Sequence, residues 1–368
     1  MKENRILVTG SGGIGGVNFV RAIRGAEELS KQKFFIVGTD FNPFHILFPE
    51  IDVRIRTPRH SDPNFLKKIK DAIKSYRIQF LHPHPSVEAR VIAEHAEEIE
   101  KLGAKLYLPN PSSIAPDKFQ IFKRLHAANV PVPRTVRIEK LEDIARGFEE
   151  LGSPLWLRAV RGAGGRLSLL VKKPEEAEMW IRLNASQGRA SISDFILQEY
   201  LPGRDLAFDS LWYNGELVTS YVRERLEYPF KHISLTGITG TPSVAKTLHY
   251  DEASKIGEKA VKALDPNPHG FFSVDLKEDE NGKPKVTEVD GKWHTTAPLW
   301  GYAFMKLRKK LTYNLAYLYL TLGIHGNLEE LQEKPPKHNL FPEDFYLVRQ
   351  MDCGVLLVDK NMNKTKIT

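Results

Sequence analysis

Cysteine is almost absent from this 368-residue chain, and long apolar runs are missing altogether. The single cysteine, Cys353, cannot form an internal disulfide, so we expect it to be a small core residue in a reducing compartment. No stretch reaches the roughly 18 consecutive apolar residues that a membrane helix needs. No apolar leader with a small-residue cleavage site follows Met1. We therefore expect a cytoplasmic protein without a membrane partner.

A dense stripe of lysine and arginine with interleaved aromatic residues is also missing, although the net charge is +7. A nucleic-acid partner is therefore not expected. The positive charge suits a cleft that binds an anionic small molecule equally well. The chain is long enough for two or three domains, and a homodimer is the default assembly.

The first third of the chain alternates strand-like and helix-like segments, which is typical of a parallel sheet with right-handed crossovers. The predicted strands are residues 5–9, 34–40, 78–82 and 105–108, and the predicted helices are residues 17–29, 65–76 and 86–102. We therefore predict an α/β fold that begins with a Rossmann-like domain over residues 1–112.

The rest of the chain mixes helices with strands that read as antiparallel. Helices are predicted at residues 119–128, 138–151, 174–183, 251–264 and 303–322, the last as one long helix. Strands are predicted at residues 154–158, 167–171, 195–201, 206–212, 216–223, 271–276 and 285–289, with a hairpin around 354–358.

A glycine-rich loop, Gly10–Gly15, follows the first strand and satisfies the spacing G-x-G-x-x-G. This spacing lets backbone approach a pyrophosphate at a helix N-terminus. Asp40 ends the next strand, where dinucleotide enzymes hold a ribose. A nicotinamide-dependent oxidoreductase or epimerase is therefore a competing prediction.

Cations and glycines gather in the second region. Lys118 begins a helix, where it can reach a phosphate. Arg158 ends an apolar strand and precedes a loop that contains Gly164, Gly165 and Arg166. Free backbone N–H groups and arginines are suited to phosphate oxygens. The sequence therefore predicts a polyphosphate site here.

Two later segments complete a nucleotide site. A strand ends at a rigid Pro-Gly turn, and we predict that its edge faces an adenine ring, with Asp205 accepting from ribose hydroxyls. The edge residues are Gln198, Glu199, Tyr200 and Leu201. Asp275 lies on one strand, and Glu288 and Asp290 lie two apart on the next, so the three are predicted to converge on Mg²⁺.

In this order and spacing, these segments resemble the ATP-grasp superfamily, and the loop resembles the synthetase modules of the carbamoyl phosphate synthetase large chain. The resemblance covers residues from about 5 to 300. Its motifs are Pro116–Pro133, Pro154–Arg158, Gly164–Arg166, Glu199–Asp205 and Glu288–Lys292. It implies a small lid lobe at 113–197, a large lobe at 198–326 and a C-terminal extension at 327–368.

The resemblance also implies an activity. ATP and Mg²⁺, with Mn²⁺ as an alternative, would activate a small-molecule carboxylate as an acyl phosphate, which an amine or similar nucleophile attacks. Arg225 and Lys292 are the predicted catalytic residues, and Arg223 and Lys231 are further candidates for binding the carboxylate. The chain departs from the family pattern Glu-x-Asn-Pro-Arg at Asp290, Gly291 and Lys292. A non-catalytic nucleotide-binding protein is therefore a third prediction.

Overall fold

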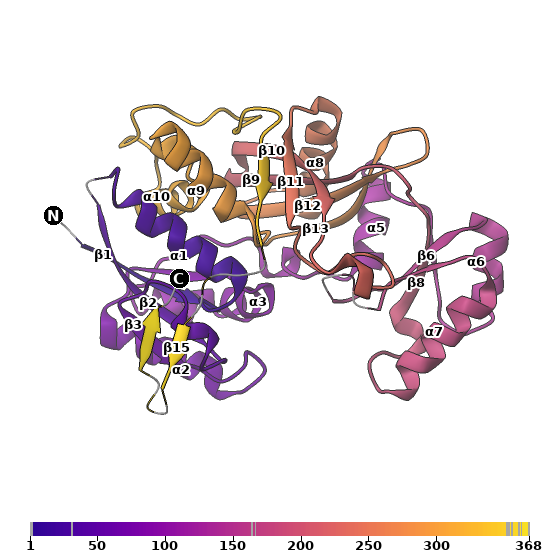
Figure 1. Ribbon diagram of the computed structural model, residues 1–368, viewed down its shortest axis with the longest axis horizontal. Helices are drawn as coiled ribbons and strands as arrows, with labels where there is room; N and C mark the ends of the chain where they lie inside the picture. Colours follow the sequence, from indigo (N-terminus) through magenta and orange to yellow (C-terminus); the bar gives the residue numbers. More distant parts are fainter. Residues whose placement is uncertain are drawn as a thin grey trace.

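The computed structural model describes residues 3–30, 32–162, 165, 167–350, 354, 356–359, 361 and 363–366. A four-stranded parallel sheet forms the N-terminal part, and a four-stranded and a six-stranded antiparallel sheet follow it (Figure 1). Within the described part, no helix combines the length and the apolar character that crossing a membrane requires.

The N-terminal sheet contains four parallel strands in the order β3-β2-β1-β4. Its strands are β1 (Glu3–Thr9), β2 (Lys33–Asp40), β3 (Val53–Arg56) and β4 (Phe80–Pro83), and its helices are α1 (Ile14–Ala26), α2 (Asn64–Tyr76), α3 (Ser86–Glu94) and α4 (Ala96–Glu100). Alternate side chains of β1 enter different cores, with Ile6 and Val8 on one face and Leu7 on the other. The predicted Rossmann-like sheet is confirmed.

The small lobe projects to the right in Figure 1 and is built on an antiparallel sheet in the order β5-β8-β6-β7. Its strands are β5 (Thr135–Arg137), β6 (Leu155–Ala159), β7 (Leu169–Val171) and β8 (Phe195–Glu199). The helices of this region are α5 (Lys118–Ala127), α6 (Asp143–Leu151) and α7 (Pro174–Ser186). Leu155, Leu157 and Leu197 pack against Ile181 to form the core of the lobe.

The large sheet has the order β13-β12-β9-β10-β11-β14. Its strands are β9 (Asp205–Tyr213), β10 (Glu216–Glu227), β11 (Val244–Leu248), β12 (Gly270–Glu278), β13 (Pro284–Asp290) and β14 (Tyr346–Val348). The later helices are α8 (Asp251–Leu264), α9 (Ala297–Arg308) and α10 (Leu315–His325). Short 3₁₀ turns occupy residues 45–47, 111–113, 192–194, 231–233 and 311–313. A hairpin of β15 (Leu356–Val358) and β16 (Lys364–Lys366) ends the chain.

Alternation along the large sheet separates an apolar face from a polar one. Leu206 and Phe208 of β9 join Val274 and Leu276 of β12 in a fully buried core with helices α5 and α8. Because neighbouring side chains in a strand point to opposite faces, the odd-numbered residues of both strands must lie on the other face. This second face forms one wall of the candidate site.

Both ends of the chain contribute to one core. Helices α9 and α10 pack against α1, and Phe19 meets Tyr319 and Trp293 edge to face. Trp293 also stacks on Phe271 of the large sheet, with a centroid separation of 3.8 Å. The N-terminal sheet and the large sheet are therefore joined by buried aromatic packing.

Several predicted elements differ from the structure. The long helix at 303–322 is wrong, because Lys309 adopts a left-handed conformation and Asn314 caps a new helix. The helix at 86–102 breaks at His95, and the strand at 105–108 is reduced to one bridge with Phe80. Strand β3 was not predicted. The C-terminal hairpin is present, but Cys353 lies outside the described residues.

Candidate functional site

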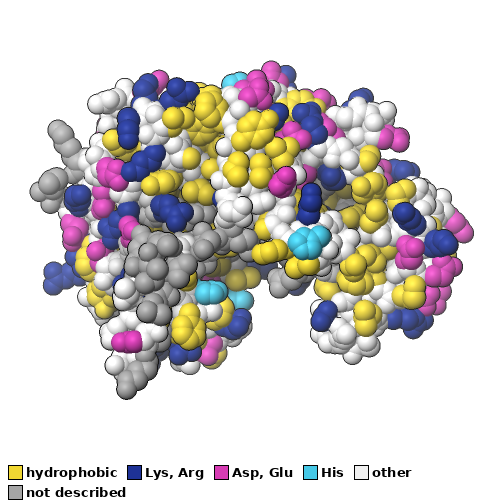
Figure 2. Space-filling view, viewed as in Figure 1, with side chains coloured by type: hydrophobic (Ala, Val, Ile, Leu, Met, Phe, Trp, Pro, Cys, Tyr) yellow, Lys and Arg dark blue, Asp and Glu magenta, His cyan; other side chains and the backbone are white. Residues whose placement is uncertain are grey.

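A cleft of about 470 Å³ lies between the small lobe and the large sheet, and one end of it reaches the N-terminal sheet. Figure 2 shows the indentation that separates the small lobe from the rest of the surface. The structure brings most of the predicted site residues to this cleft. They are Lys118, Arg158, Gly165, Gln198, Glu199, Tyr200, Leu201, Asp205, Arg225, Asp275, Glu288 and Lys292. Gly164 and Arg166 lie outside the described residues.

One end of the cleft is formed by residues 198–201, where β8 ends. They lie along the wall together with Trp156 of β6 and Pro133. Gln198 is held in place because its Nε2 donates to Thr135 Oγ1 at 2.9 Å. An apolar wall beside a strand edge suits a planar heterocycle, as the sequence predicted.

Cations converge on one carboxylate further along the cleft. Lys118 Nζ, at the start of α5, donates to Gly162 O at 2.7 Å and lies 3.5 Å from Glu288 Oε2. Arg158 Nη2 lies 3.3 Å from the same oxygen, and its Nη1 donates to Thr287 O at 3.0 Å. The glycine loop is thereby tied to the large sheet through Lys118.

The charges in this region reinforce one another. Burial opposes ionisation of Glu288, but Lys292 and Lys118 outweigh it and lower its pKa to about 2. Burial also opposes the charge of Lys292, but Asp290 and Glu288 raise its pKa above the usual range. Burial lowers the pKa of Lys118 and of Arg158. Three cations surrounding one carboxylate are well placed to accept further negative charge.

The three predicted metal ligands do not all meet. Asp275 and Glu288 are direct cross-strand neighbours and line the cleft. Asp290 lines a neighbouring cavity instead, where its Oδ1 accepts from Ala115 N at 2.8 Å and its Oδ2 lies 2.9 Å from Lys292 Nζ. Across the described residues, no group of three or more His, Cys, Asp or Glu side chains is arranged to hold a metal. The geometry leaves a pair of carboxylates, which suits Mg²⁺ that also binds substrate phosphates.

The register of the large sheet explains how polar side chains gather here. Asp275 pairs with Glu288 on one side and with Ala207 on the other, and Ala207 pairs with Arg223. The next row toward the β10 C-terminus joins Lys277, Asp205 and Arg225. The row on the opposite side joins Asp290, Ser273, Asp209 and Tyr221. All three rows lie on the face opposite to the apolar core, so one sheet face supplies the polar wall.

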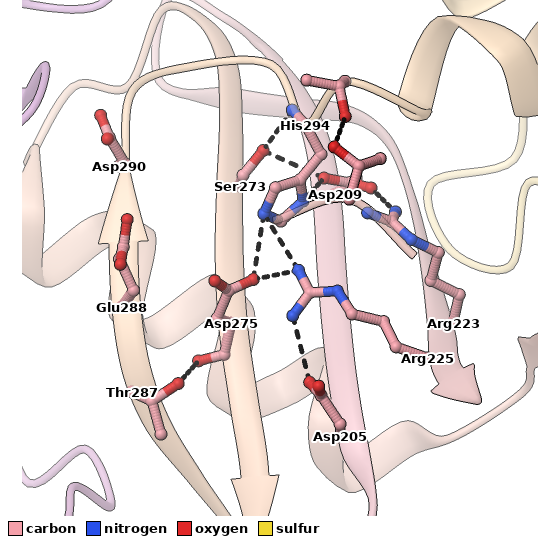
Figure 3. Close-up of polar contacts among 12 residues, drawn as sticks. Asp205, Asp209, Arg223, Arg225, Ser273, Asp275, Thr287, Glu288, Asp290 and His294 are labelled. Carbon is pink, nitrogen blue, oxygen red and sulfur yellow. Dashed lines mark hydrogen bonds and ion pairs between the residues drawn. The ribbon is translucent and has the colours of Figure 1, made fainter. Parts of the chain in front are cut away.

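A continuous polar network crosses this face (Figure 3). His294 lies between two carboxylates, with Nδ1 2.7 Å from Asp209 Oδ1 and Nε2 3.0 Å from Asp275 Oδ1. Arg225 forms ion pairs with Asp275 and, at 3.1 Å, with Asp205. Arg223 pairs with Asp209.

Two candidate residues from the sequence are wrong, and two network residues were missed. Arg223 is 1% exposed and pairs with Asp209 beneath the cleft, so it cannot contact a substrate there. Lys231 lies on an exposed 3₁₀ turn and is not among the residues that line the cleft. Asp209 and His294 were not predicted. The available signal for Asp209 was its spacing of four residues from Asp205, which places both carboxylates on the same face of β9.

The N-terminal glycine loop is packed against protein groups. A Cβ on Gly12 would lie 2.5 Å from the backbone of His45, and one on Gly15 would lie 2.0 Å from His84 Nε2. Asp40 Oδ2 accepts from Gly12 N at 3.0 Å, so this carboxylate holds the loop itself. The glycines are therefore explained by close packing.

This packing predicts a sharp contrast between neighbouring glycines. Replacing Gly12 with alanine forces a methyl group into the His45 backbone, so we expect the free energy of unfolding to fall by about 1–3 kcal/mol. Gly13→Ala is the matched control, because a Cβ there would meet its nearest atom at 3.4 Å. Chemical denaturation measures both. Equal stability of the two variants would contradict the packing that we describe.

Glu88 of α3 is buried behind this loop, and burial raises its pKa to about 7. Its folded-state pKa is above the usual 4.5, so between pH 4.5 and 7 the folded protein binds more protons than the unfolded one. Stability must therefore fall as pH rises through this window, by up to about 3 kcal/mol. We expect Glu88→Gln to remove this fall. The free energy of unfolding, measured by chemical denaturation at pH 4.5 and pH 8, tests this expectation, and Glu94→Gln, at an exposed glutamate, is the control. A Glu88→Gln variant that keeps the pH dependence of the wild type would contradict the role of Glu88.

Comparison with known proteins agrees with this geometry. A family model described as an ATP-grasp domain matches residues 115–296. The chain contains an ATP-grasp domain. This ATP-grasp domain includes α5, the small sheet and most of the large sheet, together with the lysines, arginines and carboxylates that line the cleft.

Relatives of the ATP-grasp domain are distant. The glutamate–LysW ligase ArgX of Sulfurisphaera tokodaii is 27% identical over 180 residues, which are 48% of this chain and 61% of the relative. This chain therefore aligns with about three fifths of that protein. An L-amino acid ligase from Bacillus licheniformis has a TM-score of 0.62 at 16% identity, covering 88% of this chain and 74% of that one. The biotin carboxylase domain of Hydrogenobacter thermophilus 2-oxoglutarate carboxylase was solved with MgADP and bicarbonate. It has a TM-score of 0.66 at 17% identity, and the match covers 93% of this chain and 73% of that one. These structural likenesses show the fold.

Proposed function

We propose that this chain is a cytoplasmic ligase that uses ATP and Mg²⁺ to activate a substrate carboxylate. The carboxylate oxygen attacks the γ-phosphorus, ADP leaves, and an acyl phosphate forms. An amine then attacks the acyl carbon, and an amide and inorganic phosphate are released. One observation carries the proposal: a single cleft holds a strand edge suited to adenine at one end and three cations around Glu288 further along.

In this proposal the residues of the cleft have distinct roles. The edge at 198–201 binds adenine, and Asp205 accepts from the ribose hydroxyls. Lys118, Arg158 and Lys292 offset the negative charge that develops on the phosphates. Gly165 and the neighbouring loop residues cover the nucleotide. The small lobe at 113–197 is then a lid that excludes water from the acyl phosphate.

Asp275 and Glu288 are the proposed metal ligands, and a bound Mg²⁺ would neutralise phosphate charge. Low pKa values favour the charged form of both carboxylates: burial opposes ionisation of Asp275, but the charge of Arg225 outweighs it and holds the pKa well below its usual range. Asp290 is proposed to act on Lys292 rather than on the metal, since it contacts that lysine at 2.9 Å.

The names of the relatives suggest which substrates to test. Two of them act on amino acids, and the third was solved with bicarbonate. We propose an amino-acid carboxylate as the acid that this chain activates, with bicarbonate as the alternative. The dinucleotide prediction is disfavoured by the packed glycine loop.

The proposal is tested by measuring ADP release over a panel of carboxylates, each paired with a panel of amines. We expect ADP release that requires both a carboxylate and Mg²⁺, and its loss in Asp275→Ala and Glu288→Ala. ATP binding without ADP release from any pair would support the non-catalytic prediction. Unchanged turnover in both variants would refute the metal assignment.

A further inference from the structure

Asp209 is a buried carboxylate for which the proposed reaction has no direct use. Its side chain is 0% exposed, and it lies at the centre of the large sheet on β9. It is absent from the residues that line the cleft. Burying a carboxylate is costly unless it is fully paired. The contacts of Asp209 therefore indicate what it is for.

The contacts of Asp209 are of two kinds: one balances its charge, and the others connect it to His294 at the cleft wall. Arg223, itself 1% exposed, pairs with Oδ2 and balances the charge. Ser273 Oγ lies 3.0 Å from Oδ1, and the same hydroxyl accepts from the backbone N of His294 at 3.1 Å. His294 Nδ1 lies 2.7 Å from Oδ1. Two atoms of His294, the backbone N and the ring Nδ1, are thus held by Ser273 and Asp209.

The tautomer of His294 follows from these contacts. A carboxylate only accepts hydrogen bonds, so the proton shared with Asp209 must sit on Nδ1. Nε2 then carries no proton and faces the cleft, where it accepts from Arg225 Nη2 at 3.3 Å. Arg225 in turn pairs with Asp275, whose Oδ1 lies 3.0 Å from Nε2. Figure 3 shows the His294 ring with Asp209 beside it and with Asp275 and Arg225 below it. The ring therefore connects a buried anchor to two groups of the cleft.

We propose that Asp209 is a positioning residue, which acts through His294 to fix Arg225 in the cleft and, through the ion pair of Arg225, also Asp275. The inference rests on the proposed function for its effect on turnover, but the geometry that it describes can be tested without turnover. Arg223 balances the charge of Asp209, because a buried carboxylate stays ionised only when it is paired. Loss of the Asp209 charge should leave the ring free to rotate and release Arg225 from one of its partners.

The catalysis-independent test uses NMR of protein labelled with ¹⁵N-histidine. The signals of His294 are assigned by their loss in His294→Gln. We expect wild type to show His294 protonated at Nδ1 and Asp209→Asn to show a changed tautomer distribution. Asp143→Asn is the matched control, since this buried carboxylate accepts two backbone N–H bonds in the small lobe, far from His294 in the fold. Unchanged His294 signals in Asp209→Asn would overturn the inference, even if no substrate pair supported turnover.

The activity test is a double-mutant cycle. Asp209→Asn should lower kcat by roughly 10- to 100-fold while the Kd for Mg·ATP, measured by calorimetry, changes by less than about 3-fold. In the His294→Gln background the same change should have little further effect, because Asp209 acts through that ring. Independent, multiplicative losses would show that Asp209 is merely structural and would overturn the proposal. Absence of ADP release from wild type would instead count against the proposed function.

Discussion

Glu288→Gln is expected to lower ATP-dependent ADP release by roughly 100-fold or more, since it removes the charge on which three cations converge in the cleft. Lys118, Arg158 and Lys292 all lie within 3.5 Å of its carboxylate oxygens. A neutral amide leaves these cations without their buried partner and removes one of the two proposed metal ligands. Turnover should fall even at saturating ATP and Mg²⁺.

The control for this variant lies on the neighbouring strand. Glu278 of β12 is also largely buried and paired with an arginine, Arg204, at 2.6 Å, but it does not line the cleft. Glu278→Gln should keep near wild-type turnover. Steady-state ADP release and thermal unfolding are measured for both variants. Full activity in Glu288→Gln, or equal losses in the two, would contradict the role assigned to Glu288.

Replacing Lys292 with methionine is expected to affect both stability and turnover. Its Nζ contacts Glu288 Oε1 at 3.0 Å and Asp290 Oδ2 at 2.9 Å. Removing one member of a buried ion pair leaves an unpaired charge, so we expect the free energy of unfolding to fall by about 3 kcal/mol. Loss of a cation at the proposed phosphate site should also lower kcat by roughly 100-fold.

Two further variants separate these effects. Lys292→Arg retains the charge and should restore most of the stability, because a guanidinium can reach both carboxylates. Lys246→Met removes a lysine of β11 that pairs with Asp344 and does not line the cleft. It should leave turnover unchanged. Denaturation and ADP release are the measurements, and a Lys292→Met protein with wild-type stability would be inconsistent with the network described.

Local sequence patterns predicted the parts of the site that depend on one segment. The strand edge at 198–201 and the cation at Arg158 could be predicted because each lies at the end of an apolar strand with a clear turn signal. The partners of a strand depend on register, which sequence spacing does not reveal. Asp209 and His294 are 85 residues apart, and they meet because β9 pairs with β12 and β12 pairs with β13, after which His294 follows. That is why the buried network was missed.

The expected metal triad shows that sequence spacing also fails to predict which side chains will contact one another. Spacing placed Glu288 and Asp290 on one face of a strand, and the register agrees. Asp290 accepts from the backbone of Ala115, and Lys292 lies between the two carboxylates and contacts both. The glycine loop is a further example: Gly12 and Gly15 satisfy a dinucleotide spacing, but the atoms of neighbouring segments occupy the space beside them.

The most direct test of the account is a crystal structure with Mg²⁺ and a non-hydrolysable ATP analogue. We predict one nucleotide in the cleft, with adenine against residues 198–201 and its phosphates reaching Lys118 and Arg158. The metal should contact Asp275 and Glu288. A nucleotide bound at Gly10–Gly15, or one that leaves the strand edge and the cations in contact with different molecules, would contradict the account.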